Sequence, residues 1–199
     1  MLKSIKLTVL RNGILVSMLM LLSTASLGAQ QKSGPPVNAN AAIAAKFEQN
    51  VANYMRVRQK AMAGLSVPKN TDSPAKIAEF QKQLAANIRA LRANAIKGEL
   101  FTPEVVGLFR NLVAIAMRGR DGALIRTSFE HAEPIQGVRF DVNAAYPDGL
   151  PLQSMPPSLL LNLPQLSKEL EYRFVGRELI LRDAPANLIV DVIPDLSIP

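Results

Sequence analysis

The chain has no cysteine and no tryptophan among its 199 residues, and it has a single histidine. The absence of cysteine excludes disulfide bonds, thiolate metal sites and thiol nucleophiles. Aromatic residues make up only 5% of the chain, which disfavours a stacking platform for carbohydrate. Stability must therefore come from an ordinary apolar core, and the length is sufficient for one domain or two small lobes.

Long apolar runs are also absent, apart from one segment near the N-terminus. Three basic residues precede a short apolar stretch at 14–22, and small residues follow it. This order is typical of a secretory signal peptide, and the apolar stretch has about half of the ~20 residues that cross a bilayer. The sequence predicts a signal peptide at 1–29, cleaved after Gly28 or Ala29, with no transmembrane anchor after processing. The expected product is exported to the periplasm or the exterior. The three basic residues are Lys3, Lys6 and Arg11.

Charge is unevenly distributed along the rest of the chain. Residues 40–126 carry 14 basic and 6 acidic side chains, whereas residues 127–199 carry 5 basic and 10 acidic ones. Either two lobes of opposite charge attract each other, or the basic part meets an anionic partner. Solvated faces at opposite ends of one domain are the simplest alternative.

The first half of the chain has a helical pattern. After a polar segment at 30–39, predicted to be a flexible lead-in, apolar residues recur at helical spacing within a helical lobe at 40–132. The first helix covers 43–62 and ends before Gly64. Because glycine favours the backbone geometry that follows a helix, it marks the end of this element.

Two further helices begin with clear start signals. Ser73 as N-cap and Pro74 open the second helix, which we expect to extend to Ala95 with Gly98 just beyond its end. Residues 102–104 open the third, which ends near Gly119. A short fourth helix is expected over 123–132. The helical lobe is thus predicted to be a bundle of three or four helices.

The second half changes to the alternation of β-strands. A β lobe at 133–199 should contain strands at 138–143, 170–174, 179–181 and 188–192, with turns at 176–177 and 184–187. A proline-rich connection precedes the last three strands, and its residues 158–163 should form one or two helical turns that pack into the core. Helices first and strands later predict an α+β fold with a small antiparallel sheet.

Four short stretches of the chain are distinctive: Phe101–Pro103, Met155–Pro164, Leu170–Arg177 and Leu188–Asp191. Together they resemble a group of secreted bacterial proteins of unknown function. The resemblance implies a shared fold and an exported location, and it carries no catalytic residue.

The only histidine, His131, lies between Glu130 and Glu133. A carboxylate beside a histidine raises the pKa of the imidazole, so the cluster is a candidate general base or part of a metal site. A solvated helix end is the simpler interpretation, because adjacent residues rarely point at one centre and no His-Glu-x-x-His spacing occurs.

Other signatures of chemistry are missing. The chain has no Gly-x-Ser-x-Gly elbow, phosphate-binding loop or dinucleotide motif. Asp183, Asp191 and Asp195 do not match a calcium loop, and we interpret them as polar residues at strand ends. No cofactor and no metal are predicted.

The remaining candidate is a basic helical surface. Five basic residues on the first two helices are expected to lie away from the apolar stripes, where they would attract an anionic envelope component or an acidic protein. Nucleic acid is disfavoured because the surface lacks interleaved aromatic residues and the protein is expected to be exported. A polar helix face without a partner is the alternative. The five residues are Arg56, Lys60, Lys82, Arg89 and Arg92.

Three functions remain open from the sequence. The favoured one is a non-enzymatic binding or accessory protein of the bacterial cell envelope that uses the basic helices. The second is a small envelope hydrolase built on His131 with Glu130 or Glu133. The third is a structural partner in a larger assembly.

Overall fold

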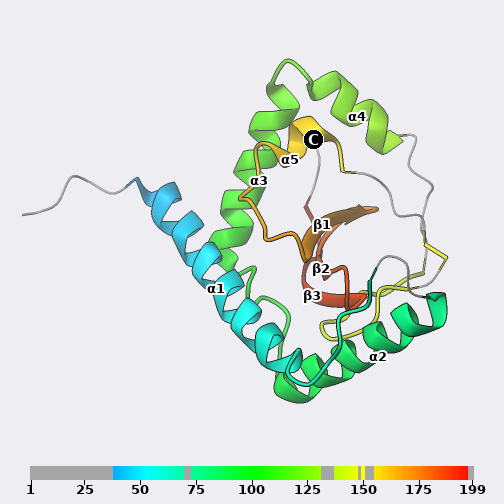
Figure 1. Ribbon diagram of the computed structural model, residues 1–199. Helices are drawn as coiled ribbons and strands as arrows, with labels where there is room; N and C mark the ends of the chain where they lie inside the picture. The colour runs from blue at the N-terminus through cyan, green and yellow to red at the C-terminus, as the bar shows by residue number, and fades with distance from the viewer. Residues whose placement is uncertain (1–37, 70–72, 131–136, 148, 151–154, 197–199) are drawn as a thin grey trace, which may run out of the picture. The chain divides into compact units, whose positions relative to one another are not determined.

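Five helices and three strands form the described part of the chain in a computed structural model (Figure 1). The structure describes residues 38–69, 73–130, 137–147, 149–150 and 155–196. These residues belong to one unit, and the α+β class is as predicted. The elements are α1 (Ala39–Ala61), α2 (Pro74–Leu91), α3 (Pro103–Arg118), α4 (Gly122–Glu130), α5 (Pro157–Leu160), β1 (Leu170–Val175), β2 (Glu178–Asp183) and β3 (Leu188–Ile193).

The start of α2 is confirmed, but its predicted end is wrong. Ser73 accepts a hydrogen bond from the Lys76 amide at 3.4 Å through its hydroxyl, and Pro74 follows. The helix ends at Leu91 instead of Ala95, because Arg92 leaves helical geometry. The Asn143 side chain donates to the Arg92 carbonyl oxygen at 2.7 Å and so satisfies a group that a longer helix would have used.

The close packing of α4 against α3 requires a glycine between them. A Cβ atom at position 122 would lie 1.9 Å from the Met117 carbonyl oxygen. This distance is a severe clash with main-chain atoms, so a residue with a side chain does not fit here. The first residue of α4 therefore sits directly on the last turn of α3. The short fourth helix is confirmed and begins one residue before the expected 123, and positions 131 and 132 of the expected range lie outside the described residues.

The sheet is a three-stranded antiparallel meander in the order β1-β2-β3. Gly176 has a positive φ of 59° in the turn between β1 and β2, as predicted for the first central position of a tight hairpin. Tyr172 pairs with Leu181, and a bulge interrupts the β2–β3 register between Leu181 and Arg182. The three C-terminal strands are thus confirmed.

The predicted strand at 138–143 is wrong. In this region only Ala145 forms a bridge, to Leu188, and Asn143 adopts a positive φ of 65° that breaks extended geometry. Phe140 is buried and stacks on Tyr146 with ring centroids 6.1 Å apart. The alternation of apolar residues therefore reflects burial of one side of an irregular segment. Residues 143–146 of this segment meet β3 through a short antiparallel bridge, in which the Asn143 amide donates to the Ile189 carbonyl oxygen at 2.9 Å, but they do not form a regular strand.

Strand alternation divides the apolar residues between two clusters. The larger cluster joins one face of the sheet to α1, α2, α3 and α5, and its centre contains Phe47, Phe101 and Phe109 in mutual contact at 5.1–5.6 Å. The smaller cluster covers the other face with Phe140 and Tyr146. Leu159 and Leu163 lie in the larger cluster, as expected for the proline-rich connection, whereas Leu160 and Leu161 of the same run are exposed.

Within the described ranges, no helix combines the length and the apolar character needed to cross a membrane.

Candidate functional site

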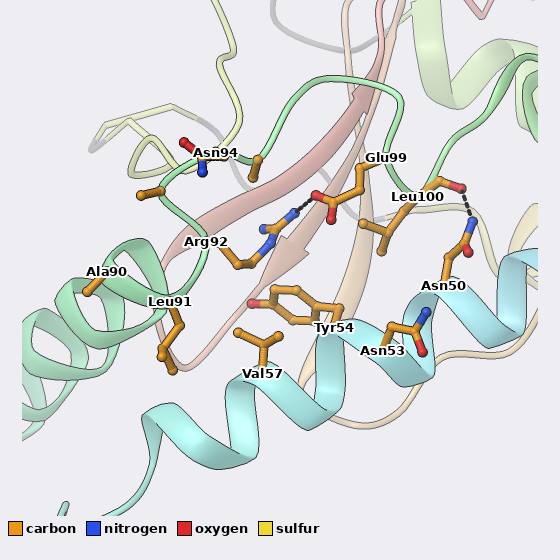
Figure 2. Close-up of a pocket in the computed structure, with 12 residues that line it drawn as sticks. Asn50, Asn53, Tyr54, Val57, Ala90, Leu91, Arg92, Asn94, Glu99 and Leu100 are labelled. Carbon is orange, nitrogen blue, oxygen red and sulfur yellow. Dashed lines mark hydrogen bonds and ion pairs between the residues drawn. The ribbon is translucent and has the colours of Figure 1, made fainter.

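A cleft of ≈ 380 Å³ lies between α1 and the segment that follows α2 (Figure 2). One wall is the middle of α1, and the other runs from the end of α2 into the loop before α3. The lining mixes amide, charged and apolar side chains. It consists of Asn50, Asn53, Tyr54 and Val57 on α1 and of residues 90–95, 99 and 100 on the opposite wall.

Arg92 is the most buried charged residue of the cleft. Nη2 of its guanidinium group donates to Oε2 of Glu99 at 2.8 Å. The same group lies over the Tyr54 ring, with Cζ of Arg92 5.0 Å from the ring centroid. Its side chain is 5% exposed, whereas that of Glu99 is 50% exposed. The pair is therefore asymmetric: the cation is held inside the fold, and the carboxylate lies at the rim.

Asn143 holds the end of α2 in this position. Its side-chain amide donates to the Arg92 carbonyl oxygen at 2.7 Å, and its Oδ1 atom lies 3.3 Å from Nη1 of Arg92. Arg89 donates to the Asn143 carbonyl oxygen at 2.7 Å. Asn143 makes these contacts with a positive φ of 65°, and asparagine adopts this left-handed conformation more readily than most residues.

A second buried charge, Asp183 of β2, connects the sheet to α1. Its Oδ2 atom accepts hydrogen bonds from Tyr54 Oη at 2.9 Å and from Arg58 Nε at 2.8 Å, and its Oδ1 atom accepts from the Ala186 amide at 3.1 Å. Burial, followed by the charge of Asp183, raises the pKa of the Tyr54 hydroxyl well above its usual range. The phenol therefore remains a neutral donor to the carboxylate.

A third buried charge, Asp191 of β3, is held by backbone alone. Its Oδ1 atom accepts from the amides of Gly98 and Val192 at 2.9 and 2.8 Å, and its Oδ2 atom accepts from those of Leu100 and Phe101 at 2.8 and 2.9 Å. Gly98 reaches this position with a positive φ of 89°. The expected role of Gly98 as the residue after α2 is therefore wrong.

Asp183 is the last residue of β2, as expected of a polar residue at a strand end, but Asp191 lies inside β3, where that interpretation is wrong. Both side chains are fully buried, which was not predicted from the sequence. The sequence held one signal of this. Asp191 interrupts the apolar run of β3, where every residue is buried, and a charge inside such a run is buried only when it has partners.

The other face of the sheet carries a partly buried polar cluster. Glu171 accepts from Arg173 and from Arg182, each at 2.6 Å. Burial opposes ionisation of Glu171, but the hydrogen bonds and charges of the two arginines outweigh it and hold its pKa below the usual value. Arg182 also covers the Tyr146 ring at 5.1 Å. This cluster fastens the irregular segment around Tyr146 to the sheet.

The structure separates the five basic residues that were predicted to bind a partner. Arg56, Lys60 and Lys82 are exposed, Arg89 is partly buried against Asn143, and Arg92 is buried in the cleft. Arg56 also donates to Oδ1 of Asn53. Of the five predicted binding residues, Arg56, Lys60 and Lys82 are therefore the ones whose side chains are exposed at the surface.

The structure does not describe the predicted catalytic cluster. His131 and Glu133 lie outside the described residues, and Glu130 is the last residue of α4 with no described side chain. Within the described ranges, no group of three histidine or acidic residues is arranged to hold a metal ion. A hydrolase centred on His131 remains a prediction from the sequence.

Comparisons of the chain with protein-family models, with curated proteins and with solved structures gave no match.

Proposed function

We propose that this protein is an exported, non-enzymatic binding or accessory protein of the bacterial cell envelope, which engages an anionic partner through α1 and α2. The exported location is proposed from the signal-peptide pattern of residues 1–29. The contact surface is proposed from the exposed basic side chains Arg56, Lys60 and Lys82.

One observation carries the proposal. None of these three side chains forms an ion pair with an acidic residue of the described chain. After Glu48, α1 contains three basic residues and no acidic one, so the positive potential of its second half is not compensated within the helix. By contrast, Arg58 and Arg92 are neutralised by Asp183 and Glu99. Uncompensated positive charge at the surface attracts anionic head groups and polyanions over a range of about 8–10 Å at physiological salt.

The two helices are held together where this surface lies. The side chain of Asn87 on α2 donates to the carbonyl oxygen of Ala61, the last residue of α1, at 2.9 Å. Lys60 is the neighbour of Ala61, and Lys82 lies five residues before Asn87. The contact fixes the two basic segments within one surface unit.

A charge-neutralising variant tests the proposal. Arg56→Gln/Lys60→Gln/Lys82→Gln should elute from heparin at lower salt than the unmodified protein, and should lose retention on vesicles that contain an anionic phospholipid. The matched control Lys97→Gln/Arg120→Gln/Lys168→Gln removes the same charge from three exposed positions elsewhere. Equal losses in the two variants would show that net charge alone drives binding and would reject the α1–α2 surface.

A further inference from the structure

We infer that the cleft beside Arg92 is a separate binding site for a small ligand with a free carboxylate group, which replaces the Glu99 carboxylate on the Arg92 guanidinium. This site differs in location and ligand from the basic surface of α1 and α2. None of the three basic side chains of that surface lines the cleft, although Arg56 donates to Asn53, which does.

Arg92 is already fixed in the geometry that carboxylate binding requires. Its side chain is 5% exposed, it lies over the Tyr54 ring, and Nη1 is 3.3 Å from Oδ1 of Asn143. Nη2 is 3.4 Å from the Val190 carbonyl oxygen and 2.8 Å from Glu99. A guanidinium held by packing loses little side-chain freedom when it binds a carboxylate, which favours recognition of that group.

Glu99 can give way to a ligand carboxylate, because the ligand then pairs with the buried Arg92 in its place. It lies in the loop between α2 and α3, its side chain is half-exposed, and its one described side-chain contact is with Arg92. A carboxylate that moves from a half-exposed position into water regains hydration in exchange for the ion pair. Glu99 therefore occupies the place of a ligand carboxylate, and Figure 2 shows the side chains of Arg92 and Glu99 meeting above the Tyr54 ring.

The rest of the lining indicates what else the ligand carries. Asn50, Asn53 and Asn94 supply side-chain amides, each of which donates and accepts hydrogen bonds. Val57 and Leu100 supply apolar surface beside them. Side-chain amides form hydrogen bonds with both the N–H and the C=O of a peptide-like group. The lining therefore fits a ligand in which a carboxylate stands next to such a group. An N-acyl amino acid and the C-terminus of a peptide share this chemistry.

The size of the cleft agrees with such a ligand. Its volume of ≈ 380 Å³ lies in the lower part of the range of about 300–1,000 Å³ that is usual for small-molecule sites. One or two residues with a free carboxylate fit this volume, whereas a folded partner would contact only the rim.

Titration of the purified protein by calorimetry tests the inference. The probes are N-acetyl-alanine, its amide N-acetyl-alaninamide, and a tripeptide with a free C-terminus. The carboxylate probes should bind and the amide should not. In Glu99→Gln the carboxylates should bind about two- to five-fold more tightly, because the competing charge is gone while a polar side chain of the same size remains.

Two further variants give the test its controls. Glu48→Gln makes the same charge change at an exposed position of α1 outside the cleft and should leave affinity unchanged. Asn94→Asp adds a negative charge to the exposed rim of the cleft and should weaken binding, without loss of a buried contact. All of these positions are exposed, so the variants should fold.

The outcomes decide the question directly. Binding of both carboxylate probes assigns the site to a small free carboxylate, and binding of the tripeptide alone assigns it to a chain terminus. Equal affinity for the acid and its amide, or equal affinity of Glu99→Gln and Glu48→Gln, would overturn the inference and leave the Arg92–Glu99 pair a structural contact. Neither result bears on heparin retention, which depends on Arg56, Lys60 and Lys82.

Discussion

Asp183 on β2 and Asp191 on β3 are two fully buried aspartates on the same small sheet, and they are stabilised in different ways. Asp183 faces a cation and a phenol from α1, whereas Asp191 accepts four hydrogen bonds from backbone amides. Both connect the sheet to the helical layer. The α1 groups that bind Asp183 are side chains, which substitution can change. The groups that bind Asp191 are main-chain amides, which substitution leaves in place.

The difference has an energetic consequence. A buried ion pair can be exchanged for apolar residues of similar volume with little net loss, because desolvation offsets much of the attraction. Backbone amides cannot be removed, so each must keep an acceptor or remain unpaired in the interior. We therefore expect the site around Asp183 to tolerate coordinated substitution and the site around Asp191 to be intolerant.

The largest effect is expected from Asp191→Ala. This change leaves the amides of Gly98, Leu100 and Phe101 without their acceptor. At about 1–3 kcal/mol for each buried unpaired group, the loss of this acceptor should lower the free energy of unfolding by about 3–9 kcal/mol. Urea denaturation measures it, with the exposed Asp141→Ala as control. Similar values for the two variants would contradict the assignment.

A smaller effect is expected at Asp183. Arg58→Met alone should lower the free energy of unfolding by about 3 kcal/mol, because it leaves the carboxylate without its cation. The triple variant Tyr54→Phe/Arg58→Met/Asp183→Leu should recover most of that loss, with only the Ala186 amide left unpaired. If the triple variant proves less stable than Arg58→Met, the two aspartates do not differ in the way proposed.

The smallest effect appears only at high pH. The pKa of Tyr54 is raised by burial and by Asp183, and burial also raises the pKa values of Tyr146 and Tyr172, the other two tyrosines of the chain. A raised folded-state pKa contributes stability that is complete below the ordinary value of 10.0 and is lost as the pH rises above it.

Alkaline titration should therefore show tyrosinate absorbance that rises together with the loss of helical circular dichroism. Tyrosinate that forms while the helices remain intact would contradict the burial of these phenols. Tyr54→Phe should lower stability at neutral pH by about 1.5 kcal/mol, the lower end of the usual range for one hydrogen bond to a charged group. It should also shift the alkaline transition, since it removes the phenol that faces Asp183.

The sequence predicted what depends on neighbouring residues. Ser73 and Pro74 marked the start of α2, and Gly176 marked the first hairpin, because caps and turns are decided within a few positions. The period of apolar residues predicted the helices for the same reason. The segment 138–143 shows the limit of that argument, since burial of one side produced the alternation of a strand without a regular strand.

The candidate site could not be predicted in the same way. Arg92 was expected at a solvated helix face, and its inward position depends on Asn143, 51 residues later. The partners of Asp183 on α1 lie 125 to 129 residues away in the sequence. Such contacts exist only after the sheet packs on the helices, so no local pattern encodes them. A charge within the apolar run of β3 was the one signal available.

The amides of the loop between α2 and α3 receive their acceptor from a residue about ninety positions later, with separations of 90 to 93. During synthesis from the N-terminus, α1, α2 and α3 therefore emerge long before Asp191 leaves the ribosome. Contacts of such large sequence separation delay the final folding step. We expect nascent chains shorter than about 190 residues to expose the face of α1–α3 that the sheet covers. Holding chaperones should bind this apolar surface until β3 has been synthesised.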